Sequence, residues 1–235
     1  MSRPAAQSRS YRGVSGDERR AQRRQKLVDA GVELFGTRGY HACSVRDVCL
    51  TASLNRRYFY ESFGALDELL RAIYDEIVAD LSRTVVEAIP PDGDFDARIR
   101  AGMEAFWAAV TADPRRARIL MIEIIGVSVE LETHRREMRH GFAAMIADQM
   151  VAAGERDGRP LALDPTLTAR GLVATITDLV IDWMRGDVDL SVAQLTAHCI
   201  TLCELVVRAA LGEAPAGAAA GGRPATGGRP PARRR

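Results

Sequence analysis

A short stretch near the start of the chain holds the side chains best suited to contact with nucleic acid. Its polar and aromatic members are Asn55, Arg56, Arg57, Tyr58 and Tyr60. Arginine can pair with guanine edges, asparagine with adenine, and hydroxyl groups with phosphate oxygen atoms. This set predicts noncovalent recognition of nucleic acid. The alternative is a helical hairpin whose charged outer face is simply solvated.

Two short helices joined by a tight turn would position these side chains. Ser44 and Asp47 have the spacing of a capping box, which begins the first helix. Asn55 is placed to cap the second helix. The apolar residues that would bury one face of the second helix are Leu54, Phe59 and Phe63. The stretch therefore predicts a helix-turn-helix whose second helix lies in the major groove.

The flanking sequence has the helical spacing that such a unit needs. Upstream, apolar residues from Leu27 to Phe35 mark an amphipathic helix, and Arg38–Gly39 supplies a cation and then a left-handed cap. Downstream, apolar residues between Leu66 and Val85 mark a long helix. Three short helices followed by a long connector are a specific arrangement, and they favour DNA binding over a solvated hairpin.

In these motifs the chain resembles the TetR family of transcriptional regulators, most strongly from Arg23 to Ala72. The residues that carry the resemblance are Arg24, Leu27, Ala30, Leu34–Phe35, Gly39–Tyr40, Ser44–Val48, Tyr58–Phe63 and Glu68–Leu70. Ser53 stands where the family usually has the turn glycine, which predicts a left-handed residue other than glycine there. Arg57 and Leu66 also depart from the usual residues, which bears on individual DNA contacts rather than on the fold.

The predicted class is all-α, with an N-terminal three-helix helix-turn-helix DNA-binding domain and a C-terminal helical ligand-binding and dimerisation domain. The expected segments are a disordered basic arm over 1–20, the helix-turn-helix domain over 21–66, the effector-binding and dimerisation domain over 67–211, and a disordered Gly/Pro/Arg-rich tail over 212–235. Helix-breaking residues divide the C-terminal half. They are Pro90–Gly93, Asp113–Pro114, Gly126 with Ser128, Gly154–Pro160 and Gly186–Asp187.

Charge and composition fit a cytoplasmic DNA-binding protein. Residues 1–62 hold twelve Lys and Arg against six Asp and Glu, whereas residues 63–211 hold fifteen against twenty-four. A basic head on an acidic body predicts nucleic acid at one end only. The four cysteines suit a reducing compartment better than a disulfide framework. No membrane span and no signal peptide are expected, because no apolar run is long enough.

The resemblance implies specific partner residues. Operator DNA would be contacted by Ser44, Arg46, Asn55, Arg56, Arg57, Tyr58 and Tyr60. A homodimer would form through the last two helices, where one apolar stripe consists of Leu195, Cys199, Leu202 and Val206. A second apolar stripe beside it means that the last helix needs cover on two sides. A fully intramolecular core is the alternative.

Glu123 is the most unusual residue of the C-terminal half, because it lies within an apolar run from Ile119 to Ile125. A buried carboxylate needs a partner, either an arginine or hydroxyl of the same fold or a polar group of an effector. The residues predicted to line an effector pocket are Met103, Phe106, Trp107, Met121, Glu123, Phe142, Met145, Thr175 and Asp178. The pocket is what the family resemblance implies, because such residues at helical spacing are more often plain core, and an exposed or dimer-rim face explains Thr175 and Asp178.

Catalysis, cofactors and metals receive little support. His198, Cys199 and Cys203 lie close together on one helix, but zinc sites need more ligands, so we interpret the two cysteines as core residues. No nucleophile–base pair or phosphate loop is present in the sequence. The predicted function is a dimeric repressor that a small apolar or amphipathic effector releases from double-stranded operator DNA. A regulator without a ligand is the main alternative, and an all-α enzyme or a protein-interaction module would belong to another class.

Overall fold

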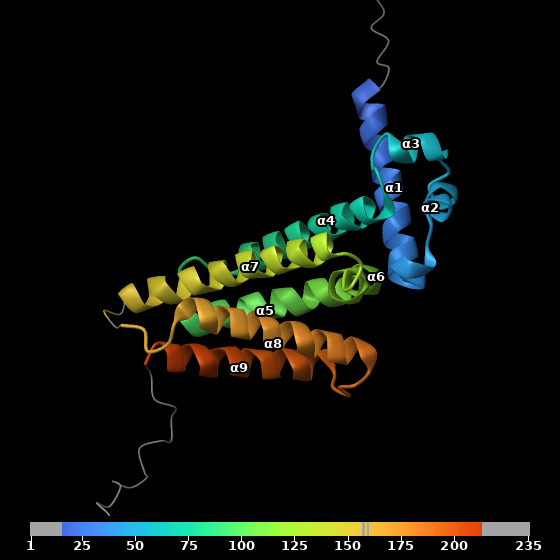
Figure 1. The fold of residues 1–235 in the computed structure, drawn as a ribbon. Coiled ribbons are helices and arrows are strands. Elements are labelled where there is room, and N and C mark those ends of the chain that lie inside the picture. The colour runs from blue at the N-terminus through green and yellow to red at the C-terminus, as the bar shows by residue number, and fades with distance from the viewer. Residues whose placement is uncertain (1–15, 157, 159, 213–235) are drawn as a thin grey trace, which may run out of the picture.

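The computed structural model describes residues 16–156, 158 and 160–212, and every regular element in them is a helix (Figure 1). The N-terminal helices are α1 (Gly16–Arg38), the single turn η1 (Tyr40–Ala42), α2 (Val45–Thr51) and α3 (Arg56–Tyr60). The C-terminal helices are α4 (Leu66–Ala88), α5 (Phe95–Ala112), α6 (Pro114–Arg118), the π-helical turn η2 (Ile119–Glu123), α7 (Val129–Arg156), α8 (Pro165–Arg185) and α9 (Val192–Ala210). The all-α class and the division into a helix-turn-helix and a C-terminal helical part are confirmed.

Local capping explains where the helices of the helix-turn-helix begin. The Asp47 backbone N–H donates to the Ser44 hydroxyl at 3.3 Å, and the Ser44 N–H donates to the Asp47 carboxylate at 3.0 Å. Asn55 accepts from the Tyr58 N–H at 3.3 Å at the start of α3. These contacts satisfy N–H groups that have no partner inside a helix. The capping box and the Asn55 cap are therefore as predicted.

Residues 16–20 were predicted to be part of a disordered arm, and this prediction is wrong. They form the first turns of α1. Asp17 and Glu18 lie in the first turn, where carboxylates stabilise the positive end of the helix dipole. Arg20 also donates to the Glu61 carbonyl oxygen at 2.9 Å. The predicted loop from Gly154 is wrong at its start as well, because α7 runs to Arg156. The rest of the predicted arm and nearly all of the predicted tail lie outside the described residues.

The turn between α2 and α3 contains the left-handed residue predicted from the sequence. Ser53 has φ of 53°, and within the described residues it alone among non-glycine residues has positive φ. A side chain in this region costs about 1–2 kcal/mol, because its Cβ crowds the following carbonyl oxygen. The turn therefore carries backbone strain that a glycine would remove.

We expect Ser53→Gly to stabilise the protein by about 0.5–1 kcal/mol, since the relieved strain exceeds the extra chain entropy that glycine loses on folding. Urea unfolding of the purified protein would measure the difference. Ser53→Ala keeps the Cβ and is the control, for which no gain is expected. An equal gain in both variants would mean that the serine hydroxyl, and not the backbone, is unfavourable.

The hydrophobic core of the helix-turn-helix extends into the C-terminal part of the protein. The core of the helix-turn-helix includes Leu69, Ile73 and Tyr74 from the first turns of α4, so it extends past the predicted boundary at residue 66. Ile119 and Ile124 from the η2 region join the same core. Figure 1 shows α1 crossing the end of the C-terminal bundle, with α4 as the link between the two parts. Movement of α4 or η2 would therefore shift residues that pack directly in the core of the helix-turn-helix.

Candidate nucleic-acid interface and effector cavity

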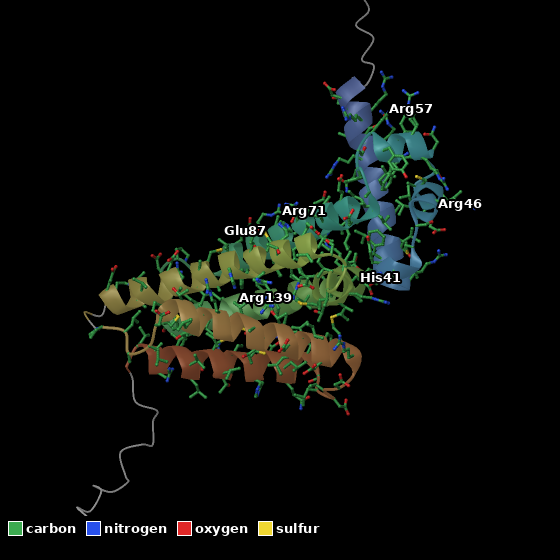
Figure 2. All side chains as sticks on the ribbon, in the orientation of Figure 1. His41, Arg46, Arg57, Arg71, Glu87 and Arg139 are labelled. Atoms are coloured by element: carbon green, nitrogen blue, oxygen red, sulfur yellow. The ribbon has the colours of Figure 1, made fainter. Side chains whose placement is uncertain are left out.

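The predicted DNA-binding side chains lie on the outer face of the helix-turn-helix. Figure 2 shows Arg57 on α3 and Arg46 on α2, both directed away from the C-terminal bundle. Ser44, Asn55 and Arg56 are exposed as well, and the Tyr60 side chain is 60% exposed. Tyr58 is half-buried. All seven predicted residues are thus accessible at least in part, and Phe59 behind them is fully buried in the core.

Neighbouring residues hold part of this surface in place. Arg57 Nε donates to Glu61 Oε1 at 3.0 Å, although the arginine side chain remains 83% exposed. The Arg23 guanidinium lies 4.5 Å from the centre of the Tyr58 ring, a cation–π contact that orders both groups. The hydrogen bond from the Ser44 hydroxyl lowers the pKa of Asp47, so the capping box stays charged at physiological pH. The surface is therefore partly organised in the absence of DNA.

We expect Arg56 and Arg57 to affect DNA binding differently from Tyr60. An arginine with a bidentate base contact should lose about 1–3 kcal/mol on replacement by alanine and relax specificity at one position. Tyr60→Phe should weaken binding to every sequence alike, because a phosphate contact carries no direct sequence information. Binding to a randomised half-site library measures both effects. Altered sequence preference in Tyr60→Phe alone would reverse the assignment.

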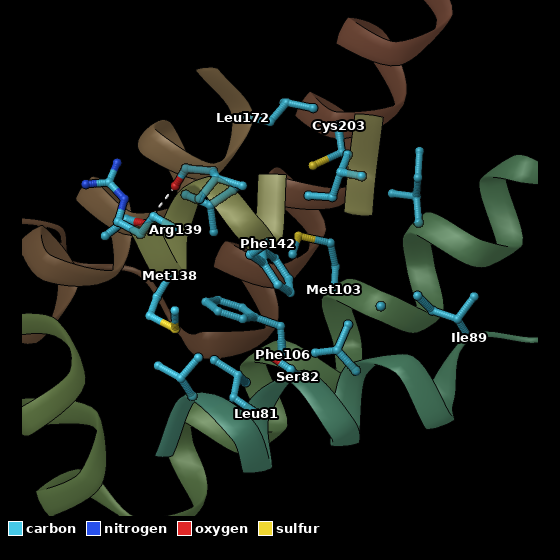
Figure 3. A pocket seen from close by; sticks show the side chains of 18 of the residues that line it. Leu81, Ser82, Ile89, Met103, Phe106, Met138, Arg139, Phe142, Leu172 and Cys203 are labelled. Atoms are coloured by element: carbon cyan, nitrogen blue, oxygen red, sulfur yellow. Dashed lines mark hydrogen bonds between the residues drawn. The ribbon is translucent and has the colours of Figure 1, made fainter. Parts of the chain in front are cut away.

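The C-terminal helices line an elongated, partly open cavity of about 240 Å³. Its wall is formed by α4, α5, η2, α7, α8 and α9, and it is predominantly apolar. Figure 3 shows Met138 and Arg139 at one side and Ile89 at the opposite side, with Phe106 and Phe142 between them. The cavity suits a ligand with a long apolar body.

The cavity includes four of the nine residues predicted to line a pocket. Met103, Phe106, Met121 and Phe142 belong to its wall. The other five do not line it. Trp107 is buried in the core beside Trp183, and Met145 is 44% exposed. Thr175 and Asp178 are exposed on the outer side of α8, and Glu123 lies near α1. The sequence gives the apolar or polar character of these five residues. Helical spacing alone did not show which side of each helix faces the cavity.

Glu123 has its partners within the fold. Its Oε1 accepts from Arg118 Nε at 2.7 Å, and its Oε2 accepts from the Tyr40 backbone N–H at 2.7 Å. Arg118 also donates to the Thr37 carbonyl oxygen at 3.1 Å. The Glu123 side chain is 9% exposed. Of the two alternatives for this carboxylate, the geometry matches the structural one: it fastens η2 to the end of α1 and the start of η1.

None of the predicted polar residues, Glu123, Thr175 and Asp178, lines the cavity. Sequence reasoning missed Ser82, Arg98, Arg139 and Gln149, all of which line it. Their only sequence signal is a polar residue on the apolar side of an amphipathic helix. Burial raises the pKa of the cavity residue Cys203 to about 11, so its thiol is neutral and unreactive at physiological pH. Within the described residues, no cluster of His, Cys, Asp and Glu could hold a metal ion.

Two of the predicted dimer residues lie inside the subunit. Leu195 and Cys199 are 1% and 0% exposed and pack in its central core, so their assignment to the interface was wrong. The reason is that both sides of α9 are apolar, which leaves its rotation undetermined from sequence. Leu202 and Val206 are half-buried, whereas Leu205 is 55% exposed on the outer face.

Much of α9 remains uncovered in the single subunit. Over an 18-residue window its mean hydropathy is 1.3, but only 28% of that window is buried. Within the described residues this helix alone has the length and composition to cross a membrane, a test that core helices of soluble proteins also pass. An apolar helix with so little cover is typical of an interaction surface.

The fold, together with the exposed basic face of α2 and α3, defines a helix-turn-helix transcriptional regulator. The chain belongs to the tetR family of bacterial regulatory proteins. Residues 27–73 match the model of that family, and residues 92–207 match the model of the tetracyclin repressor-like C-terminal domain. The family consists of transcriptional regulators rather than enzymes.

Comparison with individual proteins adds three similarities. The chain is 26% identical over 185 residues to the HTH-type transcriptional activator FasR of Mycolicibacterium smegmatis, covering 79% of this chain and 81% of that protein. It is 26% identical over 144 residues to the nicotine-responsive repressor HdnoR of Paenarthrobacter nicotinovorans, covering 60% and 73%. The structure of Bacillus subtilis FadR in complex with stearoyl-CoA superposes with a TM-score of 0.68 at 18% identity, covering 78% and 97%. That last similarity concerns the fold alone.

Proposed function

We propose that the protein is a homodimeric transcriptional repressor that an acyl-chain effector releases from operator DNA. The observation that carries this proposal is the elongated apolar cavity of the C-terminal part, lined by helices that include the connector α4. Two similarities support the effector class: Bacillus subtilis FadR is described with stearoyl-CoA, and a protein 20% identical to this chain is named a fatty acid metabolism regulator. The nicotine-responsive repressor HdnoR supports the repressor role.

The proposed DNA contacts are the exposed groups of α2 and α3 together with their caps. Arg46, Arg56 and Arg57 supply the positive charge, Asn55 supplies an amide, and Tyr60 supplies a hydroxyl for phosphate. Dimerisation through α8 and α9 would set two such heads about 34 Å apart, one turn of DNA, as a palindromic operator requires. A regulator that binds chromosomal DNA in this way acts in the cytoplasm.

The proposed coupling between the two sites is mechanical. Five cavity residues come from α4, among them Tyr74, and Tyr74 also packs in the core of the helix-turn-helix. An effector that fits the cavity better in one position of α4 shifts the population toward that position. The two reading heads then move relative to each other, and their fit to both half-sites is lost.

The test uses the intergenic DNA beside the gene for this protein, labelled for fluorescence anisotropy. We expect a salt-sensitive complex that palmitoyl-CoA or palmitic acid dissociates, while acetyl-CoA has no effect. Transcription from the same fragment should fall when the protein is added and recover with the effector. A family member without a ligand is the alternative, and it would show no response to any of these compounds.

A second candidate direction is activation, which the similarity to the activator FasR over 79% of the chain favours. The same transcription assay separates the two, because an activator would raise the transcript level when it is added. The DNA complex and its response to acyl compounds would be unchanged. The direction of regulation and the effector class are thus tested by different readouts.

A further inference from the structure

The charged side chains that line the cavity are all arginines. Arg98, Arg135 and Arg139 contribute to its wall, and within the described residues no aspartate or glutamate does. The rest of the lining is predominantly apolar, so the cavity presents positive charge to a ligand. A neutral hydrocarbon ligand would form no ionic or hydrogen-bonding contact with these arginines.

Two of these arginines already have partners, and one does not. Arg98 donates to the Pro90 carbonyl oxygen at 2.7 Å and to Gln149 Oε1 at 2.6 Å. Arg135 forms an ion pair with Glu132 at 3.0 Å. The Nε atom of Arg139 is buried and has no hydrogen-bond acceptor among the residues that the structure describes. A buried donor without an acceptor is uncommon, and it points to a ligand group as its partner.

A ligand group bound by Arg139 would lie in a cavity that is also lined by the connector helix α4. Tyr74 of α4 is 2% exposed and lines the same cavity. Burial raises the pKa of the Tyr74 phenol to about 12. The neighbouring Arg135 and Arg139 lower this pKa, but their effect is smaller than that of burial. The phenol is therefore protonated at physiological pH and can donate a hydrogen bond. Tyr74 on α4 and Arg139 on α7 therefore each contribute a hydrogen-bond donor to the wall of the same cavity.

Acyl compounds have an acceptor of the kind that the buried Arg139 Nε lacks. A fatty acid carries a carboxylate, and an acyl-CoA carries a thioester carbonyl at the same end of the chain. Guanidinium binds carboxylate in a bidentate, charge-assisted manner, and it also donates to a carbonyl oxygen. From Arg135 to Gln149 the cavity follows about four turns of α7, or roughly 21 Å, which leaves room for an extended chain beyond the polar end.

We propose that the Arg139 guanidinium and the Tyr74 hydroxyl bind the oxygen-bearing end of the acyl effector, with the hydrocarbon chain extending between Phe106 and Phe142 toward Ile89. This assignment rests on the proposed acyl response and specifies where the polar group lies. The head group then contacts α4 where Tyr74 enters the core of the helix-turn-helix. A hydrocarbon chain without a carboxylate or carbonyl oxygen would fill the cavity but lose this charge-assisted contact.

The experiment measures ligand binding and DNA release separately for wild type and Arg139→Gln. The probes are palmitic acid, palmitoyl-CoA and 1-hexadecanol, with binding followed by calorimetry and release by anisotropy of operator DNA. We expect Arg139→Gln to bind the preferred acyl compound roughly 10- to 100-fold more weakly, because one charge-assisted hydrogen bond is lost. Binding of 1-hexadecanol should change little, and Arg139→Lys should restore part of the affinity for a carboxylate.

Arg136→Gln is the matched control, since Arg136 is an exposed arginine of the same helix that does not line the cavity. It should bind all three probes as wild type does. The preference of wild type for palmitic acid or palmitoyl-CoA identifies the natural head group. Undiminished acyl binding in Arg139→Gln would overturn this assignment and leave the acyl response intact. If wild type bound none of the probes, the acyl effector itself would be refuted, and this site with it.

Discussion

Glu123→Gln should lower the free energy of unfolding by about 2 kcal/mol and leave the affinity for acyl ligands unchanged. The substitution keeps the shape of the side chain but removes the charge that pairs with Arg118 at 2.7 Å. Loss of a hydrogen bond to a charged group costs about 1.5–3 kcal/mol. The Arg118 side chain is 37% exposed, so water can partly replace its lost partner and the effect stays below that of a fully buried pair.

For a protein of this size, the expected fall in melting temperature is roughly 4–8 °C. Thermal melting with and without palmitoyl-CoA measures stability and ligand response together. Glu130→Gln is the control, because Glu130 is an exposed acid at the start of α7. An unchanged melting temperature together with loss of the ligand-induced shift would mean that Glu123 serves the effector and not the fold.

The sequence predicted the features that local chemistry determines. A capping box, an asparagine cap and a proline in the first turn each involve residues within four positions of one another. For this reason α2 begins directly after its predicted cap Ser44, and α8 ends at Arg185, directly before the predicted break at Gly186–Asp187. The left-handed Ser53 was predicted from the family resemblance instead, because the family usually has a glycine at this turn position.

Contacts between distant parts of the chain could not be predicted in this way. Glu123 was recognised as a carboxylate in need of a partner, but Tyr40 lies 83 positions away and contributes a backbone N–H, which leaves no trace in the sequence. Trp107 and Phe106 are adjacent and similar in character, and the rotation of α5 in the bundle directs only Phe106 to the cavity. Arg139 was overlooked because an arginine on a helix is usually assigned to solvent.

The proposed dimer surface on α9 was also beyond local prediction, and it leads to the largest expected effect. Both sides of α9 are apolar, so the sequence predicted that one side packs in the subunit core and the other against a partner subunit. It did not show which side faces outward. The structure directs Leu195 and Cys199 to the core and leaves Leu205 55% exposed. On the outer side of α8, Gly171 and Thr175 are exposed and small, which would allow a second copy of the helix pair to approach closely.

Leu205→Arg should therefore convert the protein into a folded monomer and reduce operator affinity by roughly 100-fold or more. In a two-fold symmetric interface the substitution occurs twice, so two unpaired guanidinium groups would be buried at a cost of several kcal/mol. The monomer would also lose the avidity of binding two half-sites through one linked pair of heads. Because Leu205 is exposed in the subunit, the α-helical circular dichroism and the subunit core should be preserved.

Sedimentation velocity and operator anisotropy measure the two effects, and Val86→Arg, a 50% exposed position on α4, is the control. A Leu205→Arg protein that sediments as a dimer and binds the operator fully would exclude this face of α9 from the interface.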